Sequence, residues 1–235
     1  MATIRLDKLI CSTFGVTRRE AKKYLARGEI CVNGQPVRDG TRHYQTDVSL
    51  TCAGKVGKYR EHVYIMMNKP DGVISASRDL KAKTALDLLP QDMRRRGLFV
   101  AGRLDKDTTG FLLITDDGDF AHEILSPRKH VDKTYLVTLR YAADERYAAA
   151  FAAGMKIGEE ICKPAVYLPL SENSARVVLQ EGKFHQIKRM FAALDNEVVA
   201  LHREKMGNLP LDDGLLPGLA RYLTDREIEM IRGMD

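Results

Sequence analysis

The stretch Ala-Gly-Arg-Leu-Asp-Lys-Asp-Thr-Thr-Gly-Phe-Leu-Leu-Ile-Thr, residues 101–115, sets the carboxylate of Asp105 between two basic residues in a polar loop. Short apolar runs at 99–101 and 111–115 flank the loop. Both runs are rich in aromatic or branched residues and lie close to Gly, so they are predicted to be strands. Two strands that enter and leave a polar loop can hold a reactive side chain still. Asp105 is therefore a candidate catalytic carboxylate. The alternative is a turn carboxylate that caps its own backbone.

The same loop carries part of a calcium-binding pattern. Asp105, Asp107, Thr109, Gly110 and Asp116 occupy positions one, three, five, six and twelve of an EF-hand-like loop. That loop needs a Glu at its last position and a helix on each side. Here the last residue is Asp and the flanks are predicted strands, so we expect no calcium site.

Several motifs along this chain, taken in order, resemble those of one enzyme family. Gly-Arg-Leu-Asp at 102–105 is similar to the signature of the RNA pseudouridine synthases. The motifs around it resemble the RsuA family within that class, and the resemblance covers nearly the whole chain. They are Asn-Lys-Pro-Asp-Gly at 68–72, Asp-Thr-Thr-Gly at 107–110, Thr-Asp-Asp-Gly at 115–118, Ser-Pro-Arg at 126–128, Lys-Thr-Tyr-Leu-Val at 133–137, Glu-Gly-Lys-Phe-His-Gln-Ile-Lys-Arg-Met-Phe at 181–191 and Leu-His-Arg-Glu at 201–204.

The resemblance implies an enzyme that isomerises one uridine of small-subunit (16S) ribosomal RNA, uridine 516 in conventional rRNA numbering. Such a reaction breaks the bond between ribose C1′ and uracil N1 and rejoins the base through C5. Because the product is an isomer, we expect no cofactor and no metal. One alternative is a synthase acting on large-subunit (23S) rRNA. The other is a catalytically inactive RNA-binding assembly factor with an S4-type module.

The resemblance also implies three catalytic residues. Asp105 aligns with the family nucleophile, Lys188 with its basic partner and Tyr135 with a tyrosine that stacks on the uracil. Arg189 is the neighbour with which Lys188 can be confused, and successive helix positions point about 100° apart, so only one should face Asp105. Without the family, either cation is an ordinary surface residue and Tyr135 an ordinary core tyrosine.

Further residues are expected to bind the substrate. Arg103 is placed to fill the space that the target nucleotide leaves when it flips out of its stack. Leu201 is a candidate apolar floor for the base, although core packing explains it as well. Arg128 and Lys133, in a basic loop before Tyr135, are predicted to contact phosphates, and Arg189 is retained as a further substrate contact.

Composition narrows the class of protein. The 235 residues, 44% of them hydrophobic, suffice for one domain of ordinary size and a small one. No apolar run approaches the roughly 20 residues of a membrane helix, and the first residues lack the apolar core of a signal peptide. The four cysteines are scattered, which argues against zinc and suits a reducing cytoplasm. We therefore expect a cytoplasmic protein.

Charge divides the chain unevenly. Residues 1–60 hold 12 Lys and Arg against 5 Asp and Glu, whereas residues 61–235 hold 25 against 27. A small basic segment beside a nearly neutral one indicates a polyanion-binding module attached to something else. We place the domain boundary there, with residues 1–60 as the module and residues 61–235 as the catalytic domain.

The module itself is predicted to contain two helices and a hairpin. The first helix runs near residues 4–11. The second starts at the capping box that begins with Thr17 and stops at Gly28. Asn33-Gly34 is a strong hairpin signal, and residues 54–60 are read as a polar linker. The pattern resembles an S4 RNA-binding domain. Its RNA contacts are expected from the basic residues Arg5, Arg18, Arg19, Lys22, Lys23 and Arg27.

In the second domain, predicted strands and helices alternate without the regular rhythm of a parallel sheet. Strands are expected at 63–69, 99–101, 111–115, 134–139, 166–168 and 176–179, and helices at 120–125, 143–153, 185–194 and after Thr224. We expect an α+β domain with a mixed, mainly antiparallel sheet flanked by helices. The expected partner is ribosomal RNA, either free 16S rRNA or a partly assembled small subunit, bound by a monomer.

Overall fold

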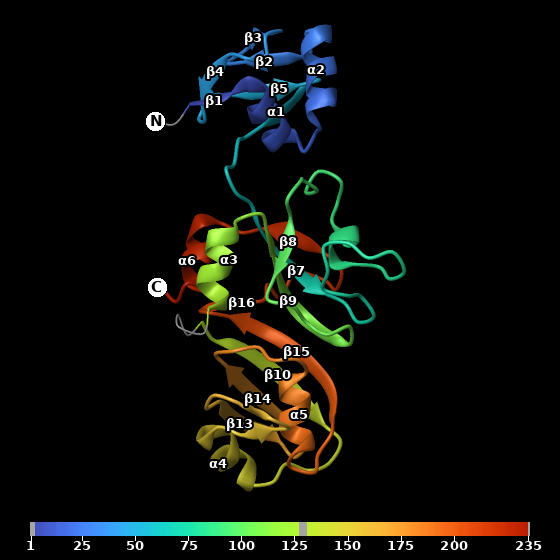
Figure 1. The fold of residues 1–235 in the computed structure, drawn as a ribbon, viewed down its shortest axis with the longest axis vertical. Coiled ribbons are helices and arrows are strands. Elements are labelled where there is room, and N and C mark those ends of the chain that lie inside the picture. Colours follow the sequence, from blue (N-terminus) through green and yellow to red (C-terminus); the bar gives the residue numbers. More distant parts are fainter. Residues whose placement is uncertain (1–2, 127–130, 235) are drawn as a thin grey trace. The chain divides into compact units, whose positions relative to one another are not determined.

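The computed structural model describes residues 3–126 and 131–234. The chain divides into two compact units, and each is described by itself (Figure 1). The first comprises residues 1–63 together with 89–98, and the second comprises residues 64–88 and 99–235. The segment 89–98 thus belongs with the first unit by its contacts, which the charge pattern of the sequence did not indicate.

The first unit is a small α/β structure. A four-stranded sheet runs in the order β3-β2-β5-β6, and β1 pairs with β4. Leu6, Leu9, Ile10, Ala21 and Leu25 bury one side of each helix against this sheet. The elements are β1 (Thr3–Arg5), α1 (Leu6–Phe14), α2 (Arg18–Arg27), β2 (Ile30–Val32), β3 (Gln35–Pro36), β4 (His43–Gln45), β5 (Leu50–Cys52) and β6 (Lys55–Gly57).

Two predictions for this unit were wrong in detail. Residues 3–5 form a strand that pairs with β4, so the first helix begins at Leu6. The expected linker at 54–60 begins as strand β6, which pairs with β5 across a tight turn. Ala53 and Gly54 both have positive φ in that turn, a backbone conformation that composition alone does not reveal.

Helix α2 has the predicted ends. The Thr17 hydroxyl accepts from the Glu20 backbone N–H, and the Glu20 carboxylate accepts from the Thr17 backbone N–H, forming a capping box. Gly28 ends the helix with a φ of 73°. Between these ends, Ala21 and Leu25 are buried and the basic residues Arg18, Arg19, Lys22, Lys23 and Arg27 are exposed. The predicted basic face is therefore open to solvent.

The second unit is built on a nine-stranded sheet in the order β13-β14-β10-β15-β9-β7-β17, with β16 on β15 and β8 on β9. Among the described residues, its strands pair antiparallel except β9 with β15, which confirms the expected mixed, mainly antiparallel sheet. Its strands are β7 (Tyr64–Lys69), β8 (Phe99–Ala101), β9 (Thr108–Thr115), β10 (Lys133–Leu139), β13 (Val166–Ser171), β14 (Ser174–Leu179), β15 (Val198–Met206), β16 (Leu209–Pro210) and β17 (Ala220–Tyr222).

Short elements cover this sheet. The helices are α3 (Gly118–Leu125), α4 (Arg146–Ala153), α5 (Gln186–Ala192) and α6 (Asp225–Ile231), and a 3-10 helix spans Ala85–Leu88. A separate hairpin joins β11 (Lys156–Ile157) to β12 (Glu160–Ile161). The Thr224 capping box starts α6 as predicted.

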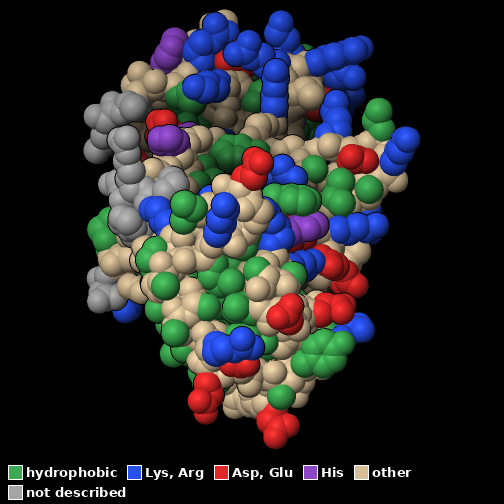
Figure 2. All heavy atoms as spheres, turned by 60° about the horizontal axis from the view of Figure 1, so that its bottom comes forward, with side chains coloured by type: hydrophobic (Ala, Val, Ile, Leu, Met, Phe, Trp, Pro, Cys, Tyr) green, Lys and Arg blue, Asp and Glu red, His purple; other side chains and the backbone are tan. Residues whose placement is uncertain are grey.

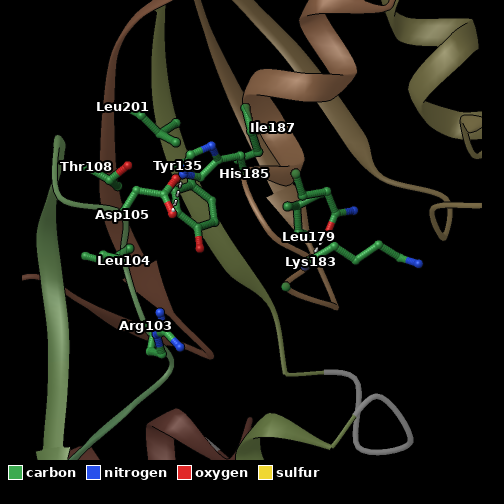
Figure 3. A pocket seen from close by; sticks show the side chains of 12 residues that line it. Arg103, Leu104, Asp105, Thr108, Tyr135, Leu179, Lys183, His185, Ile187 and Leu201 are labelled. Atoms are coloured by element: carbon green, nitrogen blue, oxygen red, sulfur yellow. Dashed lines mark hydrogen bonds and ion pairs between the residues drawn. The ribbon is translucent and has the colours of Figure 1, made fainter. Parts of the chain in front are cut away.

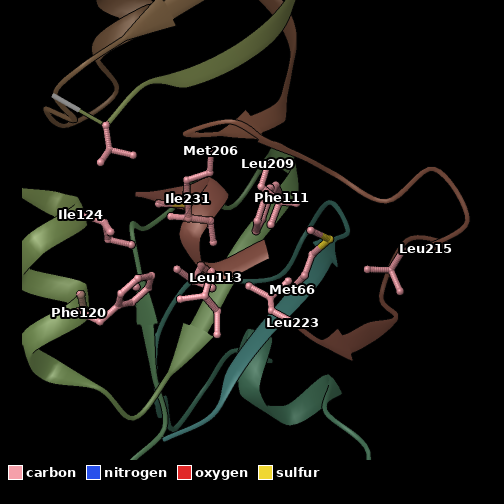
Figure 4. Packing of buried hydrophobic residues seen from close by; sticks show 14 residues of the cluster. Met66, Phe111, Leu113, Phe120, Ile124, Met206, Leu209, Leu215, Leu223 and Ile231 are labelled. Atoms are coloured by element: carbon pink, nitrogen blue, oxygen red, sulfur yellow. The ribbon is translucent and has the colours of Figure 1, made fainter. Parts of the chain in front are cut away.

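Two clusters hold the helices on the sheet. In one, Phe120 and Ile124 of α3 and Ile231 of α6 pack against Phe111 and Leu113 of β9 (Figure 4). In the other, aromatic rings of α4, β13 and α5 pack edge to face or tilted: Tyr147, Phe151, Tyr167 and Phe191. Burying a side chain of this size contributes roughly 1.5–3 kcal/mol. The second cluster fixes α5, which carries Lys188.

Strand β9 begins at Thr108, three residues earlier than predicted, because it pairs with β15 in parallel from that point. Gly110 lies opposite Arg203 in this pairing, with a φ of +99°, and a Cβ there would collide with the Arg203 backbone. The polar loop that holds Asp105 is therefore only residues 102–107, closed tightly by strands on both sides.

Candidate active site

Two buried cations hold the loop at its ends. The Arg203 guanidinium, 1% exposed, donates from Nε to the Phe111 carbonyl at 2.7 Å and from Nη2 to the Gly102 carbonyl at 2.9 Å. The Lys69 ammonium donates to the carbonyls of Lys106 and Thr108 at 3.0 and 2.8 Å. Both cations therefore use their hydrogen bonds to fix the backbone on either side of Asp105.

The Lys69 ammonium is buried, which is unfavourable for a charged group. Burial lowers the pKa of Lys69 to about 8, although the nearby carboxylates of Asp71, Asp107 and Asp105 act in the opposite direction. Its hydrogen bonds to carbonyls compensate for part of the lost hydration.

The Asp105 carboxylate lies between two basic side chains of the α5 segment. Lys188 Nζ is 3.9 Å from Asp105 Oδ2, and His185 Nε2 is 3.5 Å from Asp105 Oδ1. Lys188 also donates to Asp107 Oδ1 at 2.5 Å, and this hydrogen bond holds the pKa of Asp107 below its usual value. The Asp105 carboxylate therefore lies beside a cation, and a carboxylate in its ionised form can act as a nucleophile.

Arg189 is directed to other partners. Its guanidinium donates to Glu160 Oε2 at 2.6 Å and to the Ile157 carbonyl at 2.8 Å. The structure thus selects Lys188 over Arg189 as the cation beside Asp105. Arg189 does not line the cavity beside Asp105, because adjacent helix positions face different sides, and its contact with the substrate stays a prediction.

A small cavity of about 70 Å³ opens beside Asp105 (Figure 3). Tyr135 and Leu201, 8% and 7% exposed, lie on the adjacent strands β10 and β15 and line it together with Thr108 and Ile187. Figure 3 shows the Asp105 carboxylate directed toward the Tyr135 ring. The result is a small pocket in which the Tyr135 ring and the Leu201 side chain face the Asp105 carboxylate, an arrangement that suits a base attached to a sugar.

The remaining predicted contacts have different outcomes. Arg103 is exposed and lines the same cavity. Lys133 was expected to lie in an exposed loop. It is instead the first residue of β10, which pairs with a strand on each side, and it is only 5% exposed. Its ammonium donates to the Val131 carbonyl at 3.1 Å, and burial lowers the pKa of Lys133 to about 8. Arg128 lies outside the described residues.

His185, Arg203 and Thr108 are among the site residues that were not singled out from the sequence. His185 precedes Lys188 by three positions, the spacing of one helix face. Arg203 follows Leu201 by two, the spacing of one face of a strand. These spacings could have identified His185 from Lys188 and Arg203 from Leu201. Thr108, whose buried hydroxyl has no hydrogen-bond partner among the described residues, had no such signal.

Two other features are absent from the described part of the chain. Residues 3–126 and 131–234 contain no group of three or more His, Cys, Asp or Glu placed to hold a metal ion. Within the same residues, none of the helices has the length and apolar character needed to cross a bilayer.

A small basic α/β module followed by an α+β domain, whose central loop presents a carboxylate to a pocket lined by Tyr135 and Leu201, indicates an RNA-modifying enzyme. The chain belongs to the RNA pseudouridylate synthase family, whose model matches residues 63–193, and the S4 domain model matches residues 4–42. Both assignments confirm the resemblance seen in the motifs.

Similar proteins span nearly the same length. The chain is 42% identical to ribosomal small subunit pseudouridine synthase A of Vibrio cholerae over 97% of its length and 99% of that protein. It is 42% identical to an uncharacterised RNA pseudouridine synthase of Bacillus subtilis, over 97% and 98% of the two chains. A crystal structure of a pseudouridylate synthase, 39% identical, superposes with a TM-score of 0.69 over 97% of this chain and 99% of that one.

Proposed function

We propose that this protein converts one uridine of small-subunit ribosomal RNA to pseudouridine, with Asp105 as the nucleophile. The observation that carries the proposal is the placement of the Asp105 carboxylate beside Lys188, at the wall of a pocket formed by Tyr135 and Leu201. The names of the similar Vibrio cholerae and Escherichia coli proteins, both ribosomal small subunit pseudouridine synthases A, support the choice of ribosomal subunit.

The proposed chemistry uses the residues in this order. Asp105, which lies beside Lys188, bonds to ribose C1′ as the bond from C1′ to N1 breaks. The Tyr135 ring and the Leu201 side chain hold the detached uracil by stacking and apolar contact while it turns. C5 then bonds to C1′ as the bond between C1′ and Asp105 breaks, the C5 proton leaves and N1 gains a proton, so atoms and charge balance without any other reactant. The Tyr135 hydroxyl is the nearest candidate to assist the proton transfer.

The remaining assignments belong to the same proposal. Arg103 fills the gap that the flipped nucleotide leaves in the RNA. Residues 1–60 dock the rRNA through the exposed cations of α2 and Arg5, and residues 61–235 perform catalysis. Uridine 516 is the proposed target, in 16S rRNA or a partly assembled small subunit, and the enzyme works as a cytoplasmic monomer.

The test is to map pseudouridine in rRNA from cells with and without this gene. We expect one small-subunit position, uridine 516, to lose its modification in the deletion strain and to regain it with the wild-type gene. Loss at a position in the large-subunit rRNA would instead make the protein a 23S synthase. No change at any position would favour the inactive assembly factor.

A further inference from the structure

A second, larger cavity adjoins the one beside Asp105. It has a volume of about 460 Å³, within the roughly 300–1,000 Å³ usual for ligand sites. The two cavities share Arg103, Asp105, Tyr135, Gly182 and Lys183 in their linings. A ligand in the larger cavity therefore lies directly beside whatever occupies the smaller one.

One wall of the larger cavity is an exposed aromatic side chain. Phe184 is 74% exposed, and its ring stacks on the His185 ring with centroids 3.8 Å apart and planes 18° from parallel. With one face on His185, the ring offers its other face to solvent. Its backbone is held, because the Arg189 guanidinium donates to the Phe184 carbonyl at 3.3 Å. An apolar ring presented in this way is unfavourable in water unless something covers it.

The same cavity is lined by cations. Arg103 and Lys183 lie at its surface, and the buried side chains of Lys133 and Arg203 lie deeper. The hydrogen-bond acceptors of Lys133 and Arg203 are carbonyls and the Tyr135 hydroxyl, and neither side chain forms an ion pair within residues 3–126 and 131–234. Burying cations without a counter-ion is costly, and a bound anion offsets that cost.

An aromatic face and a set of cations in one cavity match one nucleotide: the ring stacks on its base and the cations attract its phosphate. We propose that this cavity binds the nucleotide adjacent to the target uridine, with its base unpaired and stacked on Phe184. The phosphodiester link explains why the two cavities adjoin, since consecutive nucleotides must occupy consecutive sites. This inference rests on the proposed function, because it takes the cavity beside Asp105 as the site of the flipped uridine.

The first arm of the test compares Phe184→Ala with Phe184→Tyr on an rRNA fragment that contains the target. We expect Phe184→Ala to raise KM by about 10- to 100-fold, the usual effect of losing one base stack, with kcat changed by less than about threefold. Phe184→Tyr keeps a stacking ring and should restore a KM close to that of the wild type. Tyr141→Ala, which removes another exposed aromatic ring, is the matched control and should leave KM unchanged.

The second arm identifies the nucleotide. RNA with an abasic residue on either side of the target is tested with both enzymes. At one of the two positions the missing base should raise KM for the wild type as much as Phe184→Ala does, and add nothing further to Phe184→Ala. A wild-type KM for Phe184→Ala, or independent effects at both positions, would overturn the inference. Absence of pseudouridine in the wild-type reaction would instead contradict the proposed function.

Discussion

The carboxylate of Asp105 is the residue on which the proposed chemistry depends. Its amide analogue is nearly isosteric and cannot ionise, so Asp105→Asn should fold normally and bind the rRNA fragment with an affinity close to that of the wild type. Pseudouridine formation should fall below detection, because the nucleophile is lost. Product yield and RNA affinity are measured on the same preparation, with deamidation excluded by mass spectrometry. Normal turnover by this variant would exclude Asp105 as the nucleophile.

Lys188 and Arg189 form a natural pair for comparison, since they are adjacent in α5 and have different partners. Lys188 lies beside Asp105 and Asp107, whereas Arg189 pairs with Glu160. We expect Lys188→Met to slow single turnover at saturating RNA by at least about 100-fold, within the usual effect of losing a charged active-site partner. Arg189→Met should change that rate by only a few fold. The opposite ranking would show that Arg189 is the functional cation.

Two neighbouring threonines are expected to respond oppositely to removal of the hydroxyl. Thr108 Oγ1 is buried without a partner, whereas Thr109 Oγ1 lies 2.8 Å from His202 Nδ1. A buried, unsatisfied hydroxyl destabilises the fold, so Thr108→Val should raise the free energy of unfolding by about 1 kcal/mol. Thr109→Val should lower it by a similar amount. Urea denaturation of both variants measures the difference, and equal signs would show that Thr108 has a partner in solution.

At the scale of elements, Lys69 at the end of β7 connects that strand to the loop before β9. The unfolded chain keeps the Lys69 proton up to about pH 10.5, and the folded chain releases it near a pKa of about 8. Between these values the unfolded chain binds more protons, so folding becomes more favourable as pH rises. Below pH 8 the buried Lys69 ammonium is charged, and its destabilising effect on the folded state is then greatest.

The free energy of unfolding of the wild type minus that of Lys69→Met should therefore increase from pH 8 to pH 10.5. Its slope should approach 1.4 kcal/mol per pH unit, or about 3 kcal/mol in all. Denaturation of both proteins across this range isolates the contribution of Lys69, because the other titrating groups are common to both. Parallel curves would mean that Lys69 titrates in the folded protein as it does in the unfolded chain.

At the scale of the whole molecule, basic and acidic residues are unevenly distributed along the chain. Figure 2 shows several Asp and Glu side chains close together in the lower part of the view. In the sequence, the excess of positive charge lies in residues 1–60. The exposed cations of α2 are the part of that excess with the most regular arrangement on one element.

Replacing Arg18, Lys22 and Arg27 by Gln should weaken rRNA binding and flatten its salt dependence. Each lost phosphate contact should reduce the slope of log affinity against log salt by roughly 0.7–0.9, with DNA values as the guide. Arg140→Gln and Arg146→Gln, which remove exposed arginines from the second unit, serve as controls. Binding at several salt concentrations gives both slopes. If the α2 variant keeps the wild-type slope, this face of the helix does not contact phosphates.

The local sequence determined most elements of this protein and the nature of its chemistry. Thr17 and Glu20 predicted the start of α2, and alternation predicted β10, because capping and strand periodicity depend on residues near one another in the chain. The ordered motifs led to the family and to Asp105 with Lys188, which the structure places beside each other. Helix α1, strand β6 and the start of β9 were misplaced, since each depends on a pairing partner that local patterns do not show.

Only the tertiary structure decided which side chains meet at the site. Arg203 reaches the Gly102 carbonyl because β15 runs parallel to β9, a pairing between segments about 90 residues apart. Lys133 is buried because β10 has strands on both sides, and Phe184 is exposed because the chain turns into α5 just after it. Sequence determines what each residue can do locally, but burial and long-range contact depend on how the strands are ordered in the sheet. That order placed an exposed aromatic ring and two buried cations beside the pocket of Asp105.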